Sequence, residues 1–204
     1  MAVSETVTVN GVTPELRVTV VALHKGRDAG PYQHFQSARR CVAAPATRPF
    51  SEAQLACLKA VEEGTFAIEH RAMLPRRAAV LAKAVAGPFD AILSPASDFP
   101  EQAGPFRKKM LETFGNAIDL TPFMKRDDDA KKAASDASID EVTAGLTYTG
   151  QDLDEIGSLL VVDDTLKDGK TIGAVVSVLR RHGLKHDARI VLACPLWLVP
   201  SIKP

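Results

Sequence analysis

The sequence has few cysteines and no long apolar run. Its three cysteines, Cys41, Cys57 and Cys194, are far apart and show no CxxC spacing. This argues against a disulfide framework or a zinc site and favours a reducing, cytoplasmic location. Because no apolar run reaches about 18 residues, we expect no transmembrane helix. Residues 1–5 lack a basic stretch followed by an apolar one, so no signal peptide is predicted.

An excess of charge of either sign is also absent. The 204 residues include 25 Lys and Arg against 25 Asp and Glu. This balance argues against a general nucleic-acid or membrane-surface role, because such roles usually show a basic excess. An apolar fraction of 46% and a charged fraction of 25% are typical of a globular protein. The length fits one large domain, or one domain with a small appendage.

The N-terminal part of the chain predicts a hairpin and a long loop. Apolar residues alternate over 6–23 on both sides of Asn10-Gly11, a pair that favours a tight turn. Residues 24–50 are rich in Gly, Pro, Arg and His and predict an irregular surface loop. We therefore expect residues 1–50 to form an extension that packs on a core domain of residues 51–204.

The rest of the chain alternates between the two kinds of apolar periodicity. The last strand–helix–strand unit has the spacing of a parallel crossover. Residues 125–157 contain a dense charge cluster and little core pattern, which indicates either a mobile loop or an extended hairpin. We expect an α/β fold with a central, mostly parallel sheet flanked by helices. The predicted helices are 51–64, 75–86, 105–115 (with Pro105 in its first turn) and 171–182, and the predicted strands are 89–93, 118–124, 159–162 and 189–194.

The most informative stretch is 159–171. Four apolar residues lead directly into Asp163 and Asp164, and a polar loop containing Gly169 leads into the helix that opens at Thr171. Since two unpaired carboxylates cost too much to bury, we expect the pair at the carboxyl end of the strand, where open α/β sheets bind ligands. The backbone N–H groups and the dipole of the helix N-terminus favour an anion such as phosphate there.

This stretch resembles the diphosphosugar-binding signature of type I phosphoribosyltransferases. In that family the acidic pair, here Asp163 and Asp164, holds the ribose hydroxyls. The resemblance implies a pentosyl transferase that binds phosphoribosyl diphosphate with Mg²⁺ and transfers phosphoribose to a small nitrogenous acceptor. It assigns the 5-phosphate to a loop made of Lys167, Asp168, Gly169, Lys170 and Thr171.

The resemblance also assigns segments outside this stretch. The turn after the earlier strand corresponds to the diphosphate loop, which here is Ser94, Pro95, Ala96 and Ser97. Residues 125–150 correspond to a flexible hood, in which Lys125 and Arg126 would offset diphosphate charge. Mg²⁺ would be held through the diphosphate, with Asp163 as a candidate protein ligand. Homodimers are common in this family.

The order of elements over residues 70–195 is similar to the ComF-like amidophosphoribosyltransferase group. Proteins of that group often carry a four-cysteine zinc knuckle near the N-terminus, and this chain has none. The first 50 residues therefore have another role.

Two departures from the family pattern leave other functions open. Lys167 and Asp168 stand where the family has Thr or Ser. Asp168 would repel a phosphate unless it turns away or pairs with Lys167 or Lys170. One alternative is therefore a non-catalytic member of the fold that senses phosphoribosyl diphosphate or a nucleotide, or that assists DNA uptake. Another is a receiver-like protein in which Asp163 accepts a phosphoryl group.

Overall fold

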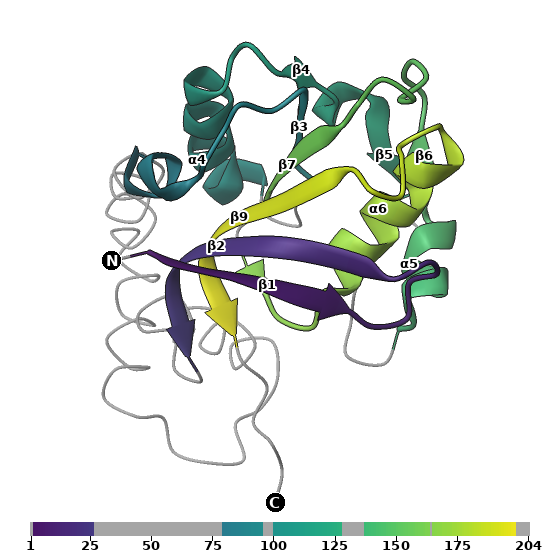
Figure 1. Ribbon diagram of the computed structural model, residues 1–204, viewed down its shortest axis with the longest axis horizontal. Coiled ribbons are helices and arrows are strands. Elements are labelled where there is room, and N and C mark those ends of the chain that lie inside the picture. Colours follow the sequence, from purple (N-terminus) through teal and green to yellow (C-terminus); the bar gives the residue numbers. More distant parts are fainter. Residues whose placement is uncertain (1, 27–78, 96–99, 128–136, 164, 199–204) are drawn as a thin grey trace, which may run out of the picture.

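The computed structural model describes residues 2–26, 79–95, 100–127, 137–163 and 165–198 (Figure 1). Within these residues the centre is a seven-stranded sheet with the order β1-β2-β9-β7-β3-β4, and β8 pairs with β9 outside this path. Every described pair in this sheet is parallel except β1 with β2. The expected α/β fold with a mostly parallel sheet is thus confirmed. The strands are β1 (Val3–Val9), β2 (Leu16–Gly26), β3 (Ala91–Leu93), β4 (Ile118–Asp119), β7 (Ser158–Val162), β8 (Thr165–Leu166) and β9 (Arg189–Leu198).

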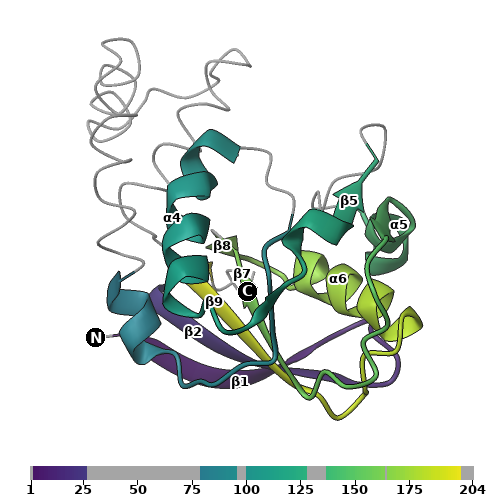
Figure 2. The same ribbon diagram turned by 90° about the horizontal axis from the view of Figure 1, so that it is seen from above.

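Helices cover both faces of this sheet (Figure 2). One face packs against α6 (Lys170–Arg181), beyond which lie α5 (Ile139–Ala144) and a small sheet of β5 (Met124–Arg126) and β6 (Leu146–Tyr148). The other face packs against α4 (Pro100–Thr113) and a helical segment over 79–84. In β7, Leu159 and Val161 join the first cluster and Leu160 and Val162 the second. A strand covered on both faces is apolar at every position, which explains the continuous apolar run.

Helix α6 forms where the sequence predicts it. Ile172, Val175, Val176 and Leu179 are buried against the sheet at the spacing i, i+3, i+4 and i+7. Burial of each such side chain stabilises the fold by roughly 1.5 to 3 kcal/mol. Gly183 follows the helix with a φ of 97°, a left-handed conformation that favours glycine.

The N-terminal hairpin is present, and its second strand joins the central sheet. Val9 lies opposite Leu16, so residues 10–15 form the connection, which is longer than the two-residue turn that Asn10-Gly11 predicts. β2 then runs parallel to β9, with Thr19 opposite Val191. Residues 2–26 therefore supply the edge of the main sheet. The predicted boundary at residue 50 lies outside the described residues and stays a prediction.

Two predicted elements are wrong in extent. The helix predicted from Pro105 begins at Pro100, which itself has the favoured place of a proline in the first turn. The predicted strand 118–124 divides into β4, a 3-10 turn over Thr121–Phe123, and β5 in the separate sheet. Pro122 explains the division, because it lacks the N–H that a continuous ladder requires.

The charged region after residue 124 contains a hairpin, one of the two forms predicted for it. β5 pairs antiparallel with β6, and α5 lies between them in the sequence. Ser138 begins α5 with a capping box, since its hydroxyl accepts from the Glu141 N–H and the Glu141 carboxylate accepts from the Ser138 N–H. The predicted loop at 24–50 beyond residue 26, and the helix at 51–64, lie outside the described residues.

Candidate functional site

The carboxyl ends of β3 and β7 lie side by side at one edge of the sheet. The two strands are parallel neighbours, with Leu93 opposite Val161. The hydroxyl of Ser94, the residue after β3, donates to the Val162 carbonyl at the end of β7 over 2.7 Å. Ser94 and Asp163 therefore leave the sheet at the same edge, where ligands of open α/β sheets bind.

Ser94 is a buried junction between several elements. It is 3% exposed, and its backbone N–H donates to the Thr121 hydroxyl after β4 over 3.0 Å. The Thr121 N–H donates in turn to the Asp119 carboxylate over 2.9 Å. Side-chain hydrogen bonds thus join the ends of β4, β3 and β7. Pro95 is also described and buried, whereas Ala96 and Ser97, the rest of the predicted diphosphate loop, lie outside the described residues.

Arg107 of α4 contacts this turn, and the sequence did not identify it as a site residue. Its Nη2 donates to the Ser94 carbonyl over 2.7 Å, and the guanidinium also donates to the Ser94 hydroxyl and the Pro95 carbonyl. A signal for its orientation exists, since it lies three residues before Met110, which is fully buried against the sheet. No local pattern connects it with Ser94, however.

Asp163 lies at the end of β7, as expected, in a break of the ladder with β9. Its N–H donates to the Ala193 carbonyl over 3.1 Å. Val162 pairs with Ala193 and Thr165 with Leu196, so β7 and β8 follow β9 in one register on both sides of the break. Pro195 lies opposite the break and has no N–H to donate. The acidic pair therefore interrupts the strand where proline ends the ladder. Asp163 is half-buried, and Asp164 lies outside the described residues.

The predicted phosphate loop leads into the N-terminus of α6. Gly169 is the N-cap, with a φ of 80°, and a Cβ atom at this position would lie 3.2 Å from Val9 Cγ1. Both the conformation and the close approach of β1 require glycine here. Lys167 is exposed, and Lys170 and Thr171 are half-buried in the first turn of the helix.

Asp168 pairs with Lys170, one of the arrangements left open above. Its Oδ1 accepts from the Lys170 backbone N–H over 3.2 Å, and its Oδ2 lies 3.6 Å from the Lys170 ammonium. An internal carboxylate thus contacts two of the groups that would otherwise favour an anion at this helix N-terminus.

The hood residues lie in the small sheet on the α6 side. Lys125 pairs with Thr147 and Arg126 with Leu146. The chain reaches them directly from Thr121, the partner of Ser94, through the 3-10 turn. Their contribution to diphosphate binding stays a prediction.

The opposite edge of the sheet holds a second tie between β3 and β7. Asp90 precedes β3, and its Oδ2 accepts from the Ser158 hydroxyl, the Ser158 N–H and the Gly157 N–H over 2.9, 2.8 and 3.0 Å. The hydrogen bond from the Ser158 hydroxyl, supported by the two backbone N–H groups and the charge of Arg189, lowers the pKa of Asp90. The three-residue strand β3 is therefore fixed at both ends by side chains.

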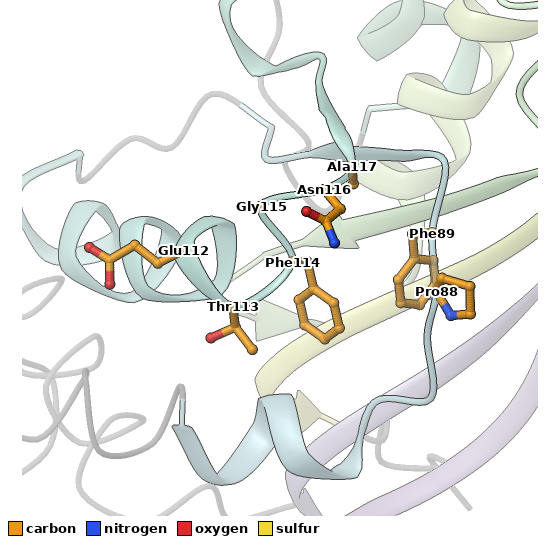
Figure 3. A pocket seen from close by; sticks show the side chains of 8 residues that line it. All are labelled: Pro88, Phe89, Glu112, Thr113, Phe114, Gly115, Asn116 and Ala117. Carbon is orange, nitrogen blue, oxygen red and sulfur yellow. The ribbon is translucent and has the colours of Figure 1, made fainter.

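A surface pocket of about 270 Å³ also lies at this opposite edge (Figure 3). The rings of Phe89 and Phe114 meet edge to face beside it at 5.6 Å, and Arg189 lies over Phe89 at 4.6 Å. The pocket is at the amino end of β3, so it is separate from the edge that carries Ser94 and Asp163. It is lined by Pro88, Phe89, Glu112, Thr113, Phe114, Gly115, Asn116 and Ala117.

Among the described residues, no group of three or more His, Cys, Asp or Glu is placed to hold a metal ion. Mg²⁺ in phosphate-transfer sites usually takes one or two protein carboxylates and fills its other positions with phosphate oxygens and water. A half-buried Asp163 beside a phosphate-binding edge fits that pattern, and its role as a ligand stays a prediction. In the same part of the chain, no helix is long and apolar enough to cross a membrane.

The fold and this edge define an α/β protein with ligand-binding features at the carboxyl ends of its parallel strands. No family model matches the sequence, and no curated protein matches it. Among solved structures, the chain is similar to a hypoxanthine phosphoribosyltransferase from Staphylococcus aureus, with a TM-score of 0.35 and 12% sequence identity. The match covers 64% of this chain and 62% of that one, less than two thirds of its length. The likeness is weak, and it is to the class of protein that residues 159–171 resemble.

Proposed function

We propose that this chain is a phosphoribosyltransferase-like protein that binds phosphoribosyl diphosphate at the carboxyl edge of β3 and β7. One observation carries this proposal. The motif assigns the turn at Ser94 and the acidic residue Asp163 to two parts of one ligand, and the 2.7 Å hydrogen bond from Ser94 to Val162 joins the strand ends that carry them. Segments far apart in the sequence thus supply neighbouring parts of one edge.

Each part of the ligand has a matching segment in this proposal. Asp163 and Asp164 accept hydrogen bonds from the two ribose hydroxyls. The loop from Lys167 to Thr171 binds the 5-phosphate with backbone N–H groups, the Lys170 ammonium and the Thr171 hydroxyl. The turn that begins at Ser94 receives the diphosphate, together with the Mg²⁺ that the diphosphate chelates.

The proposed reaction moves the ribose from oxygen to nitrogen. The bond between ribose C1 and the diphosphate oxygen breaks, and the diphosphate leaves with the electron pair. A bond forms between C1 and the acceptor nitrogen, which releases its proton to solvent. The protein's contribution is to position both partners and to balance charge, with Lys125 and Arg126 near the departing diphosphate. The ComF-like grouping and the cytoplasmic location stay predictions.

Asp168 supports a second candidate, a protein that senses the same ligand without turnover. Its carboxylate contacts the Lys170 N–H and lies 3.6 Å from the Lys170 ammonium. This arrangement weakens the attraction of the loop for a phosphate dianion. A sensor tolerates weaker binding, provided that the ligand concentration in the cell matches it.

Calorimetric titration with phosphoribosyl diphosphate, with and without Mg²⁺, tests the proposal. We expect micromolar binding that an Asp163→Ala/Asp164→Ala variant loses. Asp187→Ala is the matched control, because Asp187 is an exposed carboxylate in the loop before β9, at the opposite edge of the sheet. Diphosphate release in the presence of nitrogenous bases then separates the transferase from the sensor. Absence of binding at millimolar ligand would refute both.

A further inference from the structure

We propose that Arg107 is a positioning residue that keeps the Ser94–Pro95 turn in the shape that receives a diphosphate group. This inference rests on the proposed function and adds to it a residue that the motif does not contain. Arg107 acts through the turn rather than on the reacting atoms.

The contacts of Arg107 include all the acceptors that Ser94 and Pro95 direct toward α4. Its Nη2 donates to the Ser94 carbonyl over 2.7 Å and to the Pro95 carbonyl, and its Nε donates to the Ser94 hydroxyl. That hydroxyl passes its own proton to the Val162 carbonyl over 2.7 Å. The guanidinium thus fixes the turn and, through Ser94, links it to the end of β7.

The charge of Arg107 matters as much as its shape. Two carbonyl oxygens at this edge would present negative partial charge to an incoming diphosphate. The guanidinium covers both oxygens and places a full positive charge beside the turn, which makes the edge suitable for an anion. The planar fork of arginine reaches acceptors on neighbouring atoms at once, whereas the single nitrogen of lysine supplies the charge without that fixed geometry.

The site divides the ligand, and this division provides the test. The diphosphate would depend on the turn at Ser94, whereas the 5-phosphate would depend on residues 167–171 at the N-terminus of α6. Arg107 contacts the first segment. Its loss should therefore weaken inorganic diphosphate with Mg²⁺ and leave ribose 5-phosphate unaffected.

The experiment titrates four proteins separately with inorganic diphosphate plus Mg²⁺ and with ribose 5-phosphate. The proteins are the wild type, Arg107→Gln, Arg107→Lys and the control Lys109→Gln, which alters an exposed residue of the same helix that pairs with Glu112 at 3.3 Å. We expect both Arg107 variants to lose about tenfold or more in diphosphate affinity, the size of a lost charge-assisted contact. Ribose 5-phosphate affinity should stay within about twofold, and the control should match the wild type for both ligands.

Three results would overturn the inference. Full diphosphate affinity in Arg107→Lys would show that charge alone matters, and unchanged affinity in both variants would show that the turn needs neither charge nor fork. Equal loss of both ligands would indicate a general structural defect, which thermal unfolding of each variant would record. A wild-type protein that binds neither ligand overturns the proposed function, and the inference with it, so the two failures are distinguishable.

Discussion

Removal of the Asp168 carboxylate should strengthen the binding of ribose 5-phosphate. Asp168 accepts from the Lys170 N–H over 3.2 Å and lies 3.6 Å from its ammonium, at the helix end where the 5-phosphate is expected. Two substitutions separate its two effects. Asp168→Asn removes the charge and keeps an oxygen that accepts from the Lys170 N–H, whereas Asp168→Ala removes both the charge and the acceptor.

The magnitude follows from the distance and the exposure. The Asp168 side chain is 34% exposed, so a water-like dielectric applies. A carboxylate about 5 Å from a phosphate dianion is then repelled by about 1 to 2 kcal/mol, which corresponds to about tenfold in affinity. Asp168→Asn should gain that factor, and Asp168→Ala should gain at least as much, because it also frees the Lys170 N–H. Loss of the exposed ion pair should lower the free energy of unfolding by less than about 1 kcal/mol.

The assay is calorimetric titration with ribose 5-phosphate at low and at high salt. Because the gain is electrostatic and partly exposed to solvent, it should shrink as the ionic strength rises. Asp187→Asn, the same change of charge at the opposite edge, should leave the affinity near the wild-type value. An Asp168→Asn variant that binds ribose 5-phosphate no better than the wild type would refute the placement of the phosphate at this helix end.

Three further predictions concern stability. Asp90 has a pKa below its ordinary value of 3.8, chiefly because of the Ser158 hydroxyl, so its contribution is complete above that value and is lost as the pH falls through the lower folded value. Urea unfolding should therefore show a shallower loss of stability below about pH 4 for Asp90→Asn than for the wild type, and equal slopes would contradict this. Gly169→Ala should cost about 1 to 2 kcal/mol, because it places a side chain in the left-handed region and close to Val9; an unchanged urea midpoint would disprove the strain. Tyr148→Phe should leave the free energy of unfolding unchanged or raise it by up to about 1 kcal/mol, because the buried Tyr148 hydroxyl has no hydrogen-bond partner among the described residues, and a clear drop would reveal a bound water as its partner.

The unit from β7 to β9 could be predicted because its signals are local. A continuous apolar run marks a strand covered on both faces, and the spacing of Ile172, Val175, Val176 and Leu179 marks one face of a helix. The place of β2 beside β9 could not be predicted in this way, because it depends on pairing between residues at opposite ends of the chain. Periodicity places a residue on a face of its element and leaves its distant neighbours open.

The proposed site divides along the same line. The motif places Asp163 and Gly169 at a strand end and a helix start, and the structure agrees on both positions. Arg107 was missed because only the packing of α4 on the sheet brings it to Ser94. The effect of Pro122 was missed for a different reason, since the missing N–H that divides the predicted strand was visible in the sequence.

The short strand β3 connects the proposed site with the stability of the fold. A three-residue strand makes few ladder hydrogen bonds, so its alignment with β7 depends on side chains at both ends. At the amino end the tie is the Asp90 carboxylate, which weakens when it is protonated. At the carboxyl end the tie is Ser94, held by the guanidinium of Arg107, which keeps its charge throughout the ordinary pH range. Acid should therefore loosen β3 first at the edge remote from the proposed site, while the edge that would bind the diphosphate keeps its hydrogen bonds.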